Sequence, residues 1–280
     1  MSASVAAGTV REALTAAADA LTAAGVDDSR LDAELMLVEA VGRPRARLAS
    51  DPDAPVPAGA ARTFGELVRR RVRREPLAYI LGRKGFRGIE LAVDTRVLVP
   101  RPETELLVEV AVELRPETVL DVGTGSGAVA LSIADELPDA EVVATDTSEQ
   151  ALDVAELNAR KLGLKDRVRF ELGTLPAGQG FGLVLANLPY VSEAEWGSLE
   201  PEITEFEPRE ALLAGPDGLE AIRGLLSEIG AGAVLCGAIA LEVGAGQADA
   251  VGELTRAAGF SSVKARRDLA GIDRVVLGQR

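Results

Sequence analysis

The fold class is decided by the stretch Thr118-Val119-Leu120-Asp121-Val122-Gly123-Thr124-Gly125-Ser126-Gly127. Its first half is mostly apolar and typical of a buried strand. Its second half is a glycine-rich turn of the kind that leads from such a strand into a helix. Glycine lets the backbone come close to a bound ligand. A purely structural turn can use the same residues, so the stretch by itself leaves both interpretations open.

An acidic residue at the end of the next strand favours the ligand-binding interpretation. Residues 141–145 are typical of a second strand, which ends at Asp146, about 25 positions after Asp121. An acid about 20 residues along is expected where a ribose is bound. The combination predicts a nucleoside-cofactor site, with Asp146 accepting hydrogen bonds from ribose hydroxyls. An NAD-type cofactor stays possible because Gly123-x-Gly125-x-x-Ala128 fits the looser dinucleotide fingerprint, although the chain has no histidine for hydride chemistry.

Strands and helices alternate through the C-terminal part of the chain. This pattern predicts an α/β fold with a doubly wound, mostly parallel sheet. We expect seven strands, at residues 118–122, 141–145, 168–172, 183–186, 233–243, 262–265 and 274–277, of which the last two form a closing pair.

The chain is expected to divide into three parts. Residues 1–75 predict a small helical bundle, whose first helix opens with a capping box of Thr9 and Glu12. Residues 76–102 predict a β-hairpin linker, and residues 103–280 the α/β domain. The first 80 residues carry no net charge, so the excess of acidic residues lies in the remainder. This shift in composition supports the division.

One basic cluster stands out, at residues 69–74, where five of six residues are arginine. Two interpretations are open: a solvated helix face, or a contact with an anionic partner.

Composition excludes several classes of function. A net charge of −14 argues against a broad phosphate-binding surface. A single cysteine, Cys236, excludes an internal disulfide, and with no histidine a metal site is not expected. The N-terminus lacks the pattern of a signal peptide, and no apolar run reaches the ~18 residues of a membrane span. A cytoplasmic protein is therefore expected.

A second informative stretch is Phe181-Gly182-Leu183-Val184-Leu185-Ala186-Asn187-Leu188-Pro189-Tyr190. The apolar run predicts a short buried strand, which must end before Pro189 because proline has no N–H to donate. Asn187 then offers amide donors and an acceptor, and Tyr190 offers a flat aromatic face. This set suits a planar group that carries an NH2, such as an amide or a nucleobase amine. The alternative is a tight turn in which Asn187 only caps the backbone.

With these motifs, the chain resembles the methyltransferases that modify the glutamine of peptide chain release factors. Asp121 at the end of the first strand, just before a Gly-x-Gly-x-Gly loop, is typical of enzymes that use S-adenosylmethionine. The resemblance covers most of the chain, and its other matching segments are residues 75–82, 86–88, 97–105, 187–190, 207–212, 215–219 and 268–274. The run Arg101-Pro102-Glu103-Thr104-Glu105 and the late segments are specific to this family.

The resemblance implies a Rossmann-like methyltransferase that moves a methyl group from S-adenosylmethionine to the N5 nitrogen of glutamine in a Gly-Gly-Gln loop. It places catalysis at Asn187, Leu188, Pro189 and Tyr190. It places cofactor binding at Asp121, Gly123, Thr124, Gly125, Ser126, Gly127, Asp146, Thr147, Thr174, Leu175 and Asn187, with Arg101, Pro102 and Thr104 at the methionine end. The bundle would recognise the release factor, and a monomer is expected.

The chain departs from the family pattern at two places. The family has Asn-Pro-Pro-Tyr at the catalytic turn, whereas the second position here is Leu188, which keeps the backbone carbonyl that the family uses. An acidic residue and an aromatic residue near the adenine are replaced by Thr174 and Leu175. Two alternatives remain: an N6-adenine nucleic-acid methyltransferase, which shares this type of turn, and an S-adenosylmethionine-binding module with impaired catalysis.

Overall fold

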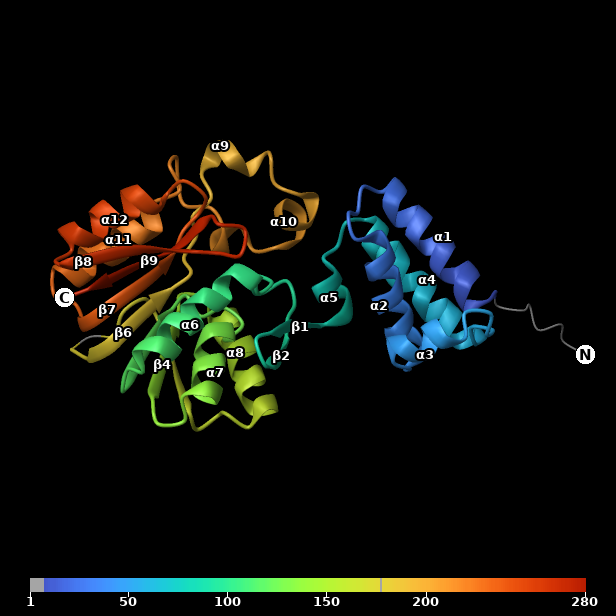
Figure 1. Cartoon of the computed structure of the whole chain (residues 1–280), viewed down its shortest axis with the longest axis horizontal. Coiled ribbons are helices and arrows are strands. Elements are labelled where there is room, and N and C mark those ends of the chain that lie inside the picture. The colour runs from blue at the N-terminus through green and yellow to red at the C-terminus, as the bar shows by residue number, and fades with distance from the viewer. Residues whose placement is uncertain (1–7, 177) are drawn as a thin grey trace, which may run out of the picture. The chain divides into compact units, whose positions relative to one another are not determined.

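A computed structural model describes residues 8–176 and 178–280 as two compact units (Figure 1). The first unit contains the chain up to Gly82 together with Pro201–Phe206, and the second contains Arg83–Glu200 and Glu207–Arg280. The boundary at Gly82 falls inside the segment 76–102 that was expected to be a linker. No helix in the described residues is long and apolar enough to cross a membrane.

The first unit is a helical bundle, as expected. Its helices are α1 (Val10–Ala23), α2 (Ser29–Val41), α3 (Arg45–Ser50), α4 (Ala58–Val72), α5 (Leu77–Leu81) and α10 (Pro201–Phe206). The predicted capping box is present, since the Thr9 hydroxyl accepts a hydrogen bond from the Glu12 N–H and the Glu12 carboxylate accepts one from the Thr9 N–H. Leu21, Met36 and Leu37 are fully buried and centre the core.

The arginine cluster is neither a fully solvated face nor a free basic patch. Arg71 is buried and pairs with Asp32 at 2.7 Å and with Glu202 of α10 at 2.7 Å. Arg74 also pairs with Glu202, at 2.6 Å, and Arg70 pairs with Glu75. Three of the six residues of the cluster therefore form ion pairs within the unit. The pairs of Arg71 and Arg74 with Glu202 attach α10 to the bundle.

The second unit contains a seven-stranded sheet in the order β5-β4-β3-β6-β7-β9-β8. The strands are β3 (Thr118–Val122), β4 (Glu141–Asp146), β5 (Val168–Leu172), β6 (Gly180–Ala186), β7 (Leu235–Glu242), β8 (Ser262–Arg267) and β9 (Asp273–Gln279). The first five run parallel, and β9 is antiparallel to both of its neighbours. The doubly wound, mostly parallel sheet and its closing strand pair are confirmed.

Helices cover both faces of this sheet. One group is α6 (Glu105–Leu114), α7 (Ala128–Glu136) and α8 (Glu149–Leu162), and the other is α11 (Glu220–Gly230) and α12 (Ala248–Ala257) (Figure 1). Ile222, Ile239 and Leu241 are fully buried where α11 meets β7. Strands buried on both faces explain the continuous apolar runs in the sequence.

Shorter elements connect the sheet to the site. A hairpin of β1 (Arg83–Phe86) and β2 (Ile89–Ala92) confirms the predicted strand pair, with a two-residue turn at Arg87 and Gly88. The 3-10 helix η1 (Pro102–Thr104) leads into α6. After β6 the chain forms α9 (Glu193–Trp196), then α10, which belongs to the first unit, and then η2 (Arg209–Ala211), which belongs to the second.

Candidate active site

The site lies at the carboxyl ends of three neighbouring strands. β3 sits between β4 and β6, and its last residue, Val122, pairs with Thr145 on one side and Ala186 on the other. The glycine loop therefore leaves the sheet between Asp146 and Asn187. This is the point where the strand order reverses, and ligands of open α/β sheets bind there.

The glycine loop is held open by Asp146. One carboxylate oxygen accepts a hydrogen bond from the Gly125 N–H at 2.9 Å, and the other accepts one from the Ser148 N–H at 2.9 Å. Gly125 has a φ of 56°, and no atom lies within 4 Å of the position where a Cβ would stand. Each carboxylate oxygen has acceptor capacity beyond these bonds. Asp146 thus shapes the loop and still faces the pocket with unused lone pairs.

Asp121 is a buried carboxylate beneath the loop. Only 2% of it is exposed, and one oxygen accepts hydrogen bonds from the Thr124 hydroxyl at 2.7 Å and the Ala130 N–H at 3.2 Å. Burial raises the pKa of Asp121 to about 6, opposed by these bonds and reinforced by the negative charge of Asp146. Both carboxylates would attract a positively charged ligand, whereas they would repel a negatively charged pyrophosphate.

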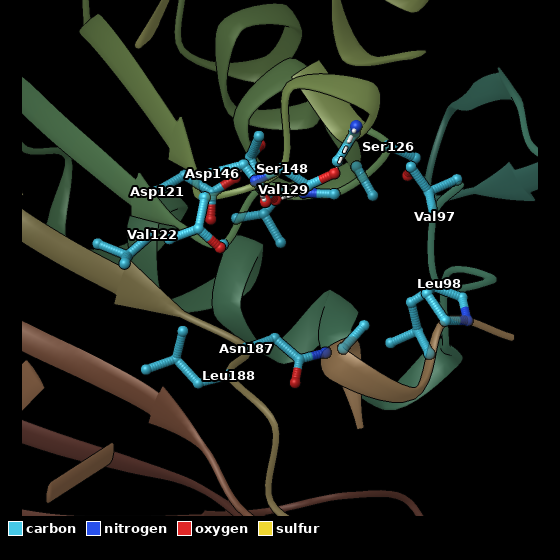
Figure 2. A pocket seen from close by; sticks show the side chains of 18 of the residues that line it. Val97, Leu98, Asp121, Val122, Ser126, Val129, Asp146, Ser148, Asn187 and Leu188 are labelled. Carbon is cyan, nitrogen blue, oxygen red and sulfur yellow. Dashed lines mark hydrogen bonds between the residues drawn. The ribbon is translucent and has the colours of Figure 1, made fainter. Parts of the chain in front are cut away.

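The segment after the hairpin forms the opposite wall of the pocket. Val97 and Leu98 stand across the open space from Asp121 and Asp146 (Figure 2). The wall is tied to the glycine loop by Asn158 of α8, which is fully buried. Its amide oxygen accepts from the Ala92 N–H, while its amide nitrogen donates to the carbonyls of Ala92 and Ser126.

Glu207 fixes the end of the same wall. Its side chain is 1% exposed, and its two oxygens accept from the Val99 N–H at 3.0 Å and from the Arg101 guanidinium at 2.5 Å. Pro208, Glu210 and Ala211 follow directly and line the pocket. The returning segment thereby closes the site against Arg101.

The turn after β6 begins with Asn187, whose amide nitrogen donates a hydrogen bond to the Thr104 hydroxyl at 3.0 Å. No described residue donates to Asn187 Oδ1. Leu188 lines the pocket, and its side chain lies 3.2 Å from the position that a Cβ on Gly123 would take. Leu188 therefore packs over the glycine loop and holds the two strand ends together, while Asn187 presents an acceptor.

Tyr190 is anchored from two sides. Its hydroxyl donates to Glu242 Oε1 at 3.4 Å, and its carbonyl accepts from the Gln247 amide at 2.9 Å. A Cβ on Gly218 would stand 2.3 Å from that carbonyl, so only glycine permits this approach. Burial, with the adjacent charge of Glu242, raises the pKa of Tyr190, which stays a neutral phenol.

Most of the predicted site residues meet in one pocket. Those that line it are Arg101, Thr104, Asp121, Gly123, Thr124, Gly125, Ser126, Asp146, Thr147, Thr174, Asn187, Leu188 and Pro189. Four do not. Gly127 is the N-cap of α7, Leu175 packs on the core of the sheet, Pro102 opens η1, and Tyr190 faces Glu242.

The sequence interpretation missed Asn158 and Glu242 and gave Glu207 no role. Glu207 lies in the matching segment 207–212, so a signal existed for it, but no local pattern marks Asn158 or Glu242. Each acts on residues that are distant in the sequence.

The donor set fits S-adenosylmethionine. The glycine loop leaves room for a close backbone approach, Asp146 retains acceptors for ribose, and two carboxylates favour a sulfonium cation. Val122 and Val129 add apolar surface to the pocket. Among the described residues, no group of three or more potential ligands is placed to hold a metal ion.

Comparisons with known proteins agree along the chain. Residues 12–82 match the PrmC N-terminal domain family, and residues 115–189 match a methyltransferase domain family. The release factor glutamine methyltransferase of Caulobacter vibrioides is 43% identical, covering 96% of this chain and 96% of its own length. That of Burkholderia pseudomallei is 41% identical, with 97% and 98% covered.

Solved structures support the fold. A methyltransferase from Pyrococcus furiosus superposes with a TM-score of 0.52 at 19% identity, covering 75% of this chain and 98% of its own. The hMettl16 catalytic domain gives 0.57 at 15% identity, covering 76% and 82%. At such identities the likeness concerns the fold alone. The Caulobacter and Burkholderia proteins, in contrast, are more than 40% identical to this chain over nearly its full length. The chain therefore belongs to the release factor glutamine methyltransferase family.

Proposed function

We propose that this protein transfers a methyl group from S-adenosylmethionine to the N5 amide nitrogen of the glutamine in the Gly-Gly-Gln loop of class-1 release factors. The observation that carries the proposal is the orientation of Asn187. Its amide nitrogen is engaged by Thr104, so its oxygen is available at the edge of the cofactor pocket. An acceptor is what a substrate amide needs there, because the amide offers two N–H donors.

The chemical difficulty is that the lone pair of an amide nitrogen is delocalised and poorly nucleophilic. When bound, S-adenosylmethionine supplies an electrophilic methyl group on sulfur. Asn187 Oδ1 and the Leu188 carbonyl accept the two N–H groups of the glutamine. Holding both hydrogens directs the nitrogen lone pair toward the pocket and stabilises the positive charge that grows on nitrogen.

The other site residues position the reactants. The loop from Gly123 to Ser126 and Thr147 hold the adenosyl group, with Asp146 on the ribose. Arg101 and Thr104 close the methionine end. Tyr190, outside the lining of the cofactor pocket, packs against the substrate amide. A strong base before transfer is unnecessary, because the proton leaves after methylation has acidified it; this agrees with a chain that lacks histidine.

The two parts of the chain divide the work. The helical bundle of residues 1–75 recognises the release factor, since a single glutamine offers little surface for specificity. Residues 76–102 link it to the methyltransferase domain of residues 103–280. We further propose a cytoplasmic monomer without stable nucleic-acid binding, in keeping with a net charge of −14.

The test is Asn187→Ala, assayed with a purified class-1 release factor and read by peptide mass spectrometry. Loss of the acceptor should lower kcat by ~100-fold or more, as for other groups that stabilise transition-state charge. S-adenosylmethionine affinity, measured by calorimetry, should change little. Ser198→Ala, an exposed position outside the pocket lining, is the control and should match the wild type. Near wild-type turnover of a folded Asn187→Ala protein would contradict the proposal.

A further inference from the structure

Gln247 is a polar residue at the start of α12 that the mechanism above does not use. It is the N-cap of that helix, but its side chain makes no capping bond there. The side-chain amide instead bonds to two other segments. Its oxygen accepts a hydrogen bond from the Gly244 N–H at 2.8 Å, and its nitrogen donates one to the Tyr190 carbonyl at 2.9 Å. One side chain therefore joins the loop after β7 to the turn after β6.

Only one orientation of the Gln247 amide satisfies both partners. A backbone N–H can only donate and a carbonyl can only accept, so exchanging the amide oxygen and nitrogen would break both bonds. The backbone N–H of Gln247 also donates to the Gly244 carbonyl, at 3.1 Å. Two hydrogen bonds thus join Gly244 and Gln247. They fix the side chain and leave its NH2 group for Tyr190.

Two glycines allow Tyr190 to approach this amide. A Cβ on Gly218 would stand 2.3 Å from the Tyr190 carbonyl oxygen and 2.8 Å from Gln247 Nε2. A Cβ on Gly244 would stand 3.0 Å from Gln247 Oε1 and 3.3 Å from the Tyr190 ring. The carbonyl and the ring of Tyr190 therefore both pack against residues that have no side chain, and any larger residue at position 218 would displace the carbonyl or the amide.

The turn from Asn187 to Tyr190 is short and is held at both ends. At its start, Ala186 is paired on both sides within the sheet. At its end, Gln247 holds the Tyr190 carbonyl. The Leu188 carbonyl, which is to accept from the substrate amide, lies between these two fixed points. Releasing one end lets the acceptors move relative to the cofactor, and small misplacements of reacting groups are costly in rate.

We propose that Gln247 is a positioning residue, which fixes the Tyr190 carbonyl and thereby the turn whose Asn187 side chain and Leu188 carbonyl receive the substrate glutamine. This role rests on the proposed function. Gln247 lies outside the lining of the cofactor pocket. Its loss should therefore slow methyl transfer and leave the affinity for S-adenosylmethionine nearly unchanged, whereas a general loosening of the domain would weaken both.

The experiment compares Gln247→Met and Gln247→Glu with the wild type in steady-state methylation of a release factor. S-adenosylmethionine affinity is measured by calorimetry on the same proteins. Methionine has about the length of glutamine but lacks its amide, so the Tyr190 carbonyl loses its donor. We expect Gln247→Met to lower kcat ~10- to 100-fold, as small misplacements of a reacting group do, with little change in the Kd of the cofactor.

The Gln247→Glu variant adds a measurement that a merely structural role would not move. An ionised carboxylate only accepts, whereas a protonated one has an O–H donor and an acceptor and can restore both bonds. The ordinary pKa of glutamate is ~4.3, and bonds that only the neutral form makes raise it. The kcat of this variant relative to the wild type should therefore rise as the pH is lowered, while the same ratio for Gln247→Met should stay constant.

The titratable groups around this position are common to all of these proteins. They are Tyr190 with Glu242, Arg101 and Arg274 near it, Asp217 paired with Arg223 next to Gly218, and Asp249 in the first turn of α12. Because the wild type carries the same groups, dividing each kcat by the wild-type value at the same pH removes their contribution.

Gln179→Glu is the matched control. Gln179 is also half-buried and accepts a hydrogen bond from Arg169, but it lies just before β6, at the end of the strand opposite the site. This variant should match the wild-type kcat at every pH. A fall equal to that of Gln247→Glu would overturn the inference, because the change of charge alone would then explain it.

Three further results would overturn the role of Gln247: wild-type kcat in Gln247→Met, a weaker cofactor affinity that accounts for its whole loss of rate, or a ratio for Gln247→Glu that does not rise in acid. If Gln247→Met does not fold, the pH dependence of Gln247→Glu decides. Absence of transfer by the wild type would contradict the proposed function and this role together, whereas normal transfer by the wild type and both variants would overturn this role alone.

Discussion

Glycine residues shape the pocket because they have no side chain and leave space beside the backbone. Gly125 adopts a positive φ, and the space beside it belongs to the cofactor pocket. Gly163 has a similar φ of 73° and equally open surroundings, but it ends α8 outside the pocket lining. The two glycines therefore differ in function while sharing the same backbone constraint.

This difference can be measured with Gly125→Ala and Gly163→Ala. Both should lose ~1 kcal/mol of unfolding free energy, because alanine is strained at positive φ. Only Gly125→Ala should also weaken S-adenosylmethionine binding, since its methyl group enters the space that the ligand needs. Calorimetric titration of both proteins tests this. Equal affinities would show that the ligand does not approach Gly125.

At the scale of elements, the short helix α10 is fastened to the bundle by buried charge. Arg71 forms ion pairs with both Asp32 and Glu202, and all three side chains are largely buried. A buried pair adds little net stability when complete, but removing one partner leaves uncompensated charge. Arg73, two positions along in the same cluster, is exposed.

We therefore expect Arg71→Gln to lower the unfolding free energy of the helical unit by ~3 kcal/mol or more. Arg73→Gln should stay within about 0.5 kcal/mol of the wild type, as surface substitutions usually do. Denaturant unfolding, followed by hydrogen exchange in α4, separates the two variants. A small effect of Arg71→Gln would mean that water or rearrangement compensates Asp32 and Glu202.

At the scale of the whole molecule, two buried carboxylates make the ligand-free fold sensitive to pH. The pKa of Asp121 is raised by burial to about 6 and that of Glu242 to about 7. The folded protein binds these protons more tightly than the unfolded chain does. Their stabilising contribution is thus complete below the unfolded pKa values of 3.8 and 4.5, and is lost as the pH rises through the folded values.

The free energy of unfolding should therefore fall with rising pH, between about pH 3.8 and 6 for Asp121 and between about pH 4.5 and 7 for Glu242. The loss is on the order of 3 kcal/mol for each group at ~1.4 kcal/mol per pKa unit. Carboxylates with lowered pKa, such as Glu202 and Asp268, act in the opposite sense, below their unfolded pKa values of 4.5 and 3.8. Denaturation of the ligand-free protein at several pH values measures the slope. Glu242→Gln should flatten the part of this pH dependence that lies nearest pH 7. An unchanged slope would contradict the raised pKa of Glu242.

Local sequence patterns are enough to predict the sheet, the glycine loop and the turn after β6. Apolar runs that end in glycine or in Asn187 predict strands and their exits, because burial and turn geometry are local properties. Parallel strands then bring their carboxyl ends to one edge, so the sequence predicts that Asp121, Asp146 and Asn187 lie close together.

The orientation of these groups depends on contacts between distant parts of the chain. The bond from Val99 to Glu207 joins residues 108 positions apart, and that from Arg71 to Glu202 joins residues 131 apart. Asn158 and Glu242 are polar residues without a periodic pattern, so nothing local distinguishes them from surface residues. Their roles follow from burial and from the partners that folding brings within hydrogen-bond distance, which are properties of the packed chain and not of any stretch of it.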